Sequence, residues 1–318
     1  MATRRSFLVQ LGLLGAGAAA VWLLRDKVVF APPSVRFAQG SDSGWLPFSS
    51  RTGLVTVTAT LNGREVHALV DSGAQFSVLD RAFAQSFGPD ATYPLPMMAY
   101  GVGGAPQVGR GITVDVTVGG LTLDRLRAAV LDLGPLAGGA GVPIPLILGQ
   151  DMLHALVADI DFPGRRIRFA DRETYALPAG AVAAPVRSQG KALLAQVTVE
   201  GKPLEVVVDT GASAALSLTT DTAETLGLFD GRPARSAQSV VLGGVTWGRI
   251  VEVERVDFAG QTVRDAEVHI FKSQPIPGFP KGLLGQGVLR RHRVVLDHGG
   301  GQMHIVGGYV PLTLGPRP

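Results

Sequence analysis

Two stretches of the chain alternate apolar and polar residues in the same way. Val55, Val57, Ala59 and Leu61 are separated mostly by threonine, and this period of two predicts a strand with one buried face. Residues 193–199 repeat the pattern in the second half of the chain. A turn dipeptide and a second, strongly apolar strand follow each stretch, so the pattern predicts two equivalent β-hairpins.

The turns of these hairpins carry residues typical of tight connections. Asn62-Gly63 is a strong hairpin signal because both central turn positions need φ > 0, and Glu200-Gly201 lies at the same place in the second half. The strands that follow are expected at Glu65–Val70 and Leu204–Val208. Each of them runs directly into an aspartate.

The similarity of the two halves extends beyond the hairpins. Residues 61–74 match residues 199–212 without a gap, at an offset of 138. Residues 147–153 match residues 283–289 at an offset of 136. Because order and spacing are both kept, the sequence predicts an internal duplication with two lobes.

The remaining pattern predicts a mostly β, two-lobed fold with pseudo-two-fold symmetry. Closing hairpins are expected over residues 160–169 and 294–306, and short helices at Arg81–Phe87 and Asp221–Leu226. Tyr175–Gln189, rich in alanine and proline, is expected to link the lobes. The predicted divisions are an N-terminal segment over 1–34, a first lobe over 35–178 and a second lobe over 183–312.

Composition narrows the class of protein. Hydrophobic residues make up 46% and charged residues 17%, which excludes a disordered chain. The net charge of +3 comes from residues 1–27, which hold four basic residues and one acidic residue. The rest of the chain is formally neutral and predicts no nucleic-acid surface. Cysteine is absent, which excludes disulfides and a thiol nucleophile.

The first residues resemble an export signal. Arg4-Arg5 precede an apolar run over residues 7–24, and the arginine pair favours a twin-arginine signal over a general secretory one. Cleavage after the alanines at 18–20 and retention of the run as an anchor both stay open. The run is near the roughly 20 residues that span a bilayer, which favours the anchor. The expected location is therefore periplasmic, with the chain held at the inner membrane.

Asp71 and Asp209 end the two apolar strands, and a hydroxyl residue and a glycine follow each of them. A carboxylate at such a place is costly unless it is hydrogen-bonded or functional. Across a pseudo-two-fold axis, the two turns would bring the carboxyl groups together. When two carboxyl groups lie this close together, they share one proton. The pair can then activate a water and protonate the reacting group without a metal or a cofactor.

The motif Asp-Ser/Thr-Gly-Ala after an apolar strand, followed later by two apolar residues and glycine, resembles the retropepsin family of aspartic proteases. Over residues 50–310 the chain resembles two retropepsin protomers fused into one. The resemblance implies an acid-protease fold, hydrolysis of a peptide or protein substrate, no cofactor or metal, and a monomer that forms the site alone. The residues it assigns are the catalytic Asp71 and Asp209, supported by Ser72, Gly73, Ala74, Thr210, Gly211 and Ala212.

In this family a glycine-rich hairpin, the flap, closes over the substrate. The resemblance implies flaps at Met97–Gly111 and Val240–Gly248. Ile147-Leu148-Gly149 and Leu283-Leu284-Gly285 are implied to pack behind the aspartates. The candidate flap residues are Tyr100, Gly101, Gly103, Gly104, Gly243 and Gly244.

Lobe two departs from the family pattern. Ser77-Val78-Leu79 continues lobe one as in the family, whereas Ala215-Leu216-Ser217 stands there in lobe two. The lobes are therefore not equivalent. Three functions stay open: an active endopeptidase, an inactive peptide-binding module, and a processing protease for one partner.

Ser213 lies in a sequence similar to a nucleophile elbow, but no helix pattern follows it. The six histidines form no metalloprotease motif.

Overall fold

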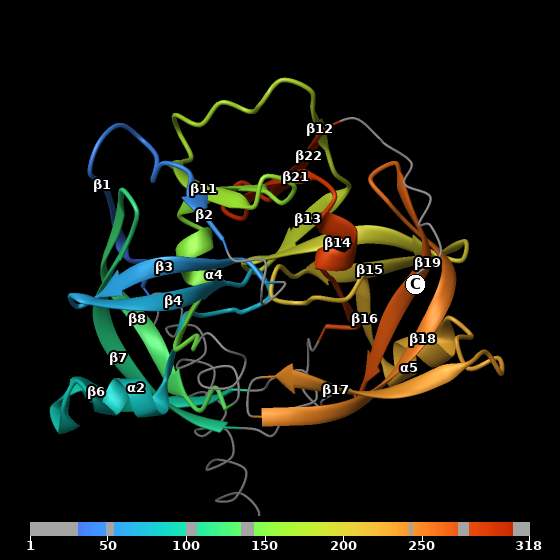
Figure 1. The fold of residues 1–318 in the computed structure, drawn as a ribbon, viewed down its shortest axis with the longest axis horizontal. Coiled ribbons are helices and arrows are strands. Elements are labelled where there is room, and N and C mark those ends of the chain that lie inside the picture. The colour runs from blue at the N-terminus through green and yellow to red at the C-terminus, as the bar shows by residue number, and fades with distance from the viewer. Residues whose placement is uncertain are drawn as a thin grey trace, which may run out of the picture.

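The computed structural model describes residues 31–48, 54–99, 107–134, 143–241, 244–272 and 280–307. Figure 1 shows two β lobes side by side, with a further layer of strands above them. The predicted mostly β, two-lobed fold is confirmed. Within these ranges no helix is long and apolar enough to cross a membrane. The expected anchor over residues 7–24 lies outside them.

Each lobe contains a closed ring of strands in the same order. Among the described residues, lobe one has the ring β3-β4-β9-β5-β8-β7, closed by pairing of β7 with β3. Lobe two has the ring β14-β15-β20-β16-β19-β18, closed by pairing of β18 with β14. The strands of lobe one are β1 (Ser34–Phe37), β3 (Thr56–Leu61), β4 (Arg64–Val70), β5 (Val78–Asp80), β6 (Thr92–Ala99), β7 (Gln107–Val118), β8 (Leu121–Leu131) and β9 (Leu146–Leu148). Those of lobe two are β13 (Val186–Gln189), β14 (Ala192–Val199), β15 (Lys202–Val208), β16 (Leu216–Thr219), β17 (Ala234–Val241), β18 (Gly244–Phe258), β19 (Gln261–Phe271) and β20 (Gly282–Leu284).

A third sheet joins the lobes. Its order is β12-β22-β21-β10-β11-β2, so a hairpin from each lobe meets at the β10–β21 pair. Asp161 and Asp297 close these hairpins, and each accepts a hydrogen bond from a turn glycine N–H. The strands are β2 (Leu46–Pro47), β10 (Leu156–Asp161), β11 (Arg166–Asp171), β12 (Ala181–Ala183), β21 (Arg293–Asp297) and β22 (Gln302–Val306).

The predicted hairpin turns form because their residues accept the left-handed backbone region. Asn62 and Gly63 have φ of 46° and 82°, and Glu200 and Gly201 have φ of 47° and 81°. Both pairs therefore have the two positive φ values that match the twist of the flanking strands. The strands expected on either side of these turns are confirmed.

One sequence prediction about the connections differs from the structure, and one feature of the structure was not predicted. Tyr175–Gln189 is not a plain linker, because β12 and β13 lie within it and pair with β22 and β14. Two short helices directly after Gly149 and Gly285 were not predicted, because four residues are too few to show a helical period. The helices are α2 (Arg81–Gln85), η2 (Pro89–Ala91), α4 (Gln150–Leu153), α5 (Thr220–Thr225) and α6 (Gln286–Leu289).

The register of lobe two corrects one sequence match. Val78 pairs with Ile147 in lobe one, and the residue that pairs with Leu283 in lobe two is Ser217. Since Ile147 and Leu283 are equivalent, Val78 is equivalent to Ser217 and not to Leu216. The loop after the lobe-two aspartate is therefore one residue longer than the sequence match indicated.

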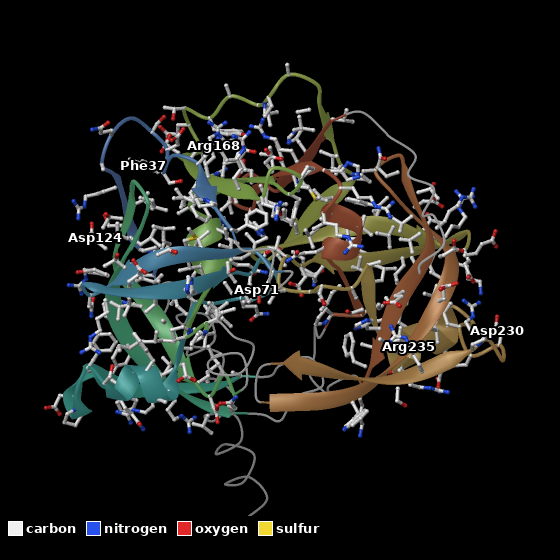
Figure 2. All side chains as sticks on the ribbon, in the orientation of Figure 1. Phe37, Asp71, Asp124, Arg168, Asp230 and Arg235 are labelled. Atoms are coloured by element: carbon white, nitrogen blue, oxygen red, sulfur yellow. The ribbon has the colours of Figure 1, made fainter. Side chains whose placement is uncertain are left out.

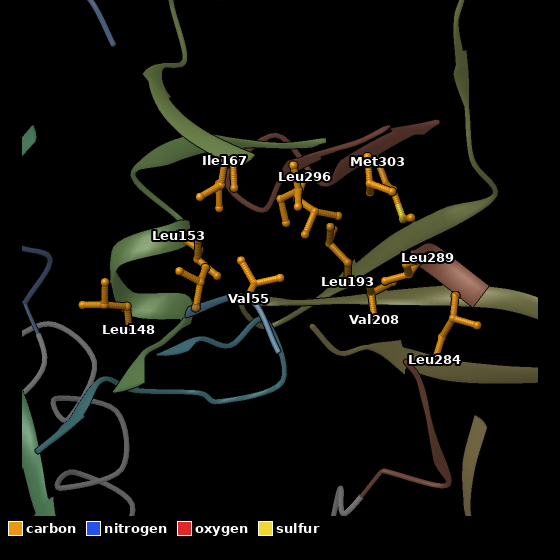
Figure 3. Close-up of a cluster of buried hydrophobic side chains, with 14 of the residues drawn as sticks. Val55, Leu148, Leu153, Ile167, Leu193, Val208, Leu284, Leu289, Leu296 and Met303 are labelled. Atoms are coloured by element: carbon orange, nitrogen blue, oxygen red, sulfur yellow. The ribbon is translucent and has the colours of Figure 1, made fainter. Parts of the chain in front are cut away.

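One hydrophobic core extends across both lobes. Figure 3 shows side chains of the joining sheet, among them Ile167, Leu296 and Met303, above Leu153 and Leu289 of the two short helices. All five side chains are buried. This shared core holds the two lobes against each other and so determines where their aspartate turns meet.

Candidate active site

Each aspartate begins the loop that leaves an apolar strand. Asp71 follows β4, and its N–H donates to the carbonyl of Leu148 at 3.0 Å. Asp209 follows β15, and its N–H donates to the carbonyl of Leu284 at 2.9 Å. Figure 2 shows Asp71 near the middle of the molecule, where the lobes face each other. The apolar-apolar-glycine segments thus lie directly beside the aspartates, as the resemblance implied.

Four hydrogen bonds cross between the two aspartate loops. The Ser72 hydroxyl donates to the carbonyl of Val208 at 2.8 Å and accepts from the N–H of Thr210 at 3.0 Å. The Thr210 hydroxyl donates to the carbonyl of Val70 at 2.7 Å and accepts from the N–H of Ser72 at 3.0 Å. Both hydroxyl residues are fully buried. This reciprocal contact ties the ends of the two strands together.

The loop amides hold each carboxylate in place. In each lobe one carboxylate oxygen accepts hydrogen bonds from the N–H groups of the glycine and alanine that follow. The distances are 2.8 and 3.1 Å for Asp71, and 2.7 and 3.2 Å for Asp209. Both side chains are therefore fixed by bonds within their own loop.

The two glycines are needed because the opposite carboxyl group lies against them. A Cβ on Gly73 would lie 2.5 Å from Cγ of Asp209, and a Cβ on Gly211 would lie 2.6 Å from Cγ of Asp71. Neither distance leaves room for a side chain. The structure thus brings the two predicted aspartates, serine, threonine and glycines into one pair of facing loops.

Burial raises the proton affinity of both carboxyl groups, and each group also acts on the other. Burial raises the pKa of Asp71, and a hydrogen bond with Asp209 partly opposes this. Burial also raises the pKa of Asp209, which is 8% exposed, and the charge of Asp71 adds to the rise. The pair therefore holds one proton over a range of pH in which two separate aspartates would both be ionised.

Two buried glutamines support the loops and were missed from the sequence. Gln150 donates from its side-chain amide to the carbonyl of Ser72 at 2.8 Å, and Gln286 donates in the same way to Thr210 at 2.5 Å. The sequence did carry a signal for them, because Gln150 and Gln286 occupy the same position in the matching segments 147–153 and 283–289. A polar residue kept in both copies beside an apolar-apolar-glycine segment marks a buried hydrogen-bonding role.

A further buried pair exists in lobe one alone among the described residues. Asp151 accepts hydrogen bonds from the N–H and the hydroxyl of Ser77, at 3.0 and 2.8 Å. The Ser77 hydroxyl also accepts from the N–H of Gly149 at 3.1 Å. Gly287 stands at the position of Asp151 in lobe two and packs directly on the backbone of Ala215. The loops behind the two aspartates are thus built differently.

The flap candidates fall mostly outside the described residues. This holds for Tyr100, Gly101, Gly103, Gly104 and Gly243. The structure does show the stems of both hairpins, where β6 pairs with β7 and β17 pairs with β18, with Gly244 opposite Val241. The part of the chain that the structure describes holds no group of three or more His, Asp or Glu side chains arranged for a metal ion.

Two family models of aspartyl proteases match the chain, one over each lobe. Residues 57–152 match the family model described as aspartyl protease, and residues 195–291 match that of the gag-polyprotein aspartyl protease. DNA damage-inducible protein 1 of Kluyveromyces lactis is 29% identical over 131 residues, which cover 41% of this chain and 29% of that protein. The chain thus spans less than a third of the length of this curated relative.

Among solved structures, a retropepsin-like aspartic protease from Rickettsia conorii is 20% identical, with a TM-score of 0.32, over 40% of this chain and 89% of that one. The two family models together take up more than half of the chain, and each includes one of the facing aspartates. The chain belongs to the retropepsin-like aspartyl proteases and carries two of their domains in tandem.

Proposed function

We propose that this protein is an aspartic endopeptidase in which Asp71 and Asp209 form the catalytic pair. The observation that carries the proposal is the reciprocal contact of Ser72 and Thr210, which holds the two carboxyl groups against each other's loop. A pair that shares one proton has a base and an acid in the same site.

The shared proton gives the two groups complementary roles. Burial raises the pKa of both Asp71 and Asp209, so the pair keeps one proton. The ionised member of the pair takes a proton from the attacking water. The protonated member donates to the carbonyl oxygen of the peptide as that oxygen gains negative charge. The roles reverse when the amine leaves and the pair returns to its starting state.

The test is cleavage of a mixed peptide library from pH 3 to pH 8. Wild-type protein is compared with Asp71→Asn and Asp209→Asn, and with Asp90→Asn, an exposed carboxylate in η2, as the control for lost charge. The proposal expects cleavage by wild type and Asp90→Asn, and none by the two site variants. Four folded but equally silent proteins would reject cleavage of generic peptides and leave two alternatives, the inactive peptide-binding module and a processing protease for one partner.

The location of the protein is a separate proposal. Arg4-Arg5 and the apolar run over residues 7–24 support export through a twin-arginine signal and retention at the inner membrane. Replacing both arginines with lysine should leave the protein in the cytoplasm, while mass measurement of the exported chain shows whether the run is removed. Normal export of the double variant would contradict a twin-arginine signal.

A further inference from the structure

The face of each lobe that carries its aspartate can be traced strand by strand. Side chains alternate along a strand, so Leu69 lies on the same face of β4 as Asp71, while Val70 points into the core. In lobe two Val207 lies on the face of Asp209, and Val208 belongs to the core. Residues paired beside Leu69 and Val207 therefore continue the surface next to the catalytic pair.

In lobe one this row is entirely aliphatic. Leu69 pairs with Ile147, Ile147 with Val78, and Val78 with Ala129. All four belong to a hydrophobic cluster separate from the main core, and Ala74 and Phe76 of the aspartate loop pack against it. Lobe one thus offers an apolar wall beside Asp71.

In lobe two the same row becomes polar. Val207 pairs with Leu283, Leu283 with Ser217, and Ser217 with His269. Ser217 stands where lobe one has Val78, and His269 stands where it has Ala129. The residues on either side of them, Leu216, Leu218, Val268 and Ile270, belong to the core, which fixes Ser217 and His269 on the aspartate's face.

Both polar side chains keep unused hydrogen-bonding groups within the part of the chain that the structure describes. Neither the Ser217 hydroxyl nor the His269 ring makes a hydrogen bond to another residue that the structure describes, although Ser217 is only 9% exposed. With strands about 4.8 Å apart, Ser217 lies two strands, or about 10 Å, from the aspartate's strand, and His269 lies about 14 Å away. An extended peptide advances about 3.3 Å per residue, so side chains near the scissile bond reach this distance.

The charges around the pair favour a neutral partner. Burial lowers the pKa of His269, with Glu267 acting against this shift and Arg235 adding to it, so the ring is neutral at neutral pH. Glu267 lies on the same face of β19 as His269, and Arg235 binds it at 2.8 Å. Figure 2 shows Arg235 on the lobe-two side of the molecule. Because Arg235 and Glu267 neutralise each other, their ion pair offers no net charge to a charged side chain of the substrate.

We propose that Ser217 and His269 form a polar subsite that selects a substrate with a carboxamide side chain, asparagine or glutamine, facing lobe two. A carboxamide matches the site because it both donates and accepts hydrogen bonds. Lobe one selects an aliphatic side chain on the other side of the scissile bond. The inference rests on the proposed endopeptidase function.

The test compares peptides that differ only in glutamine, methionine or glutamate at each position around the cleaved bond. Methionine has a similar length and no hydrogen-bonding amide. Two hydrogen bonds give wild type about a tenfold higher kcat/KM for glutamine than for methionine. The double variant Ser217→Val, His269→Ala carries the lobe-one residue at both positions, and it should bring this ratio near one. Thr113→Val, an exposed strand hydroxyl of lobe one, should leave the ratio unchanged.

The outcomes separate the two proposals. Cleavage can need both aspartates while the glutamine-to-methionine ratio of kcat/KM is the same in wild type and in the double variant. That result overturns the subsite and leaves the protease assignment standing. Equal cleavage of glutamate and glutamine peptides also overturns the carboxamide assignment. Absence of cleavage overturns the protease, and binding of the same peptides to Asp71→Asn protein then decides the subsite. Glutamine bound about tenfold tighter supports it, and equal binding overturns it.

Discussion

Replacing Ser72 with alanine removes the hydroxyl that serves both loops of the candidate site. That hydroxyl donates to the carbonyl of Val208 and accepts from the N–H of Thr210, and Ser72 is fully buried. The variant leaves both backbone groups buried without a partner, at a cost of about 1–3 kcal/mol each. We expect the free energy of unfolding to fall by about 2–6 kcal/mol, a large part of the roughly 5–15 kcal/mol of an ordinary domain.

The assay is urea unfolding of the purified protein at pH 7, followed by the fluorescence of its three tryptophans. Peptide cleavage is measured on the same samples and should fall as well, because the loops that carry the aspartates separate. Ser72→Thr is the matched control, since Thr210 makes the equivalent contacts from lobe two. It should stay within about 1.5 kcal/mol of wild type. A loss below about 1 kcal/mol for Ser72→Ala, with cleavage intact, would refute the reasoning.

Three further predictions concern single side chains. Gly73→Ala places a methyl group against the carboxyl group of Asp209, and a displacement of about 1 Å should lower kcat about a hundredfold in steady-state kinetics; unchanged kcat contradicts the close approach. Asp159→Ala removes a fully buried carboxylate bound by Arg293 and Arg168, and should cost about 3–5 kcal/mol in urea unfolding; a loss below about 1 kcal/mol contradicts this. Asp209→Asn should become more stable relative to wild type as pH rises above the unfolded aspartate pKa. The raised pKa of Asp209 means that the folded wild type keeps a proton that the unfolded chain releases, so its stability falls with rising pH; a constant difference in melting temperature from pH 3 to pH 7 contradicts this.

The pH behaviour of Asp159 has the opposite sign. Burial acts to raise its pKa, but hydrogen bonds from Arg293, Tyr175 and Arg168 together hold the pKa below the ordinary value. A lowered pKa contributes stability that is present above the unfolded pKa and lost as pH falls through the folded one. Asp159 and Asp209 thus work in opposite directions with pH, because one is surrounded by donors and the other faces a second carboxylate.

Local signals in the sequence were enough for the elements that carry the site. The alternation before Asn62 and before Glu200 has the period of a strand, and the two turns need only residues that accept positive φ. The duplication then showed that Asp71 and Asp209 occupy equivalent positions. These inferences hold because strand period, turn type and repeat spacing depend on residues close together in the chain.

What the tertiary structure decided depends on residues far apart in the chain. Ser72 and Thr210 are 138 residues apart, and their contact exists because the shared core places the two loops together. The added residue in lobe two moves Ser217, rather than Leu216, into the row beside Asp209. Since a shift of one residue moves a side chain to the opposite face of a strand, only the pairing of strands could show that the two walls of the site differ.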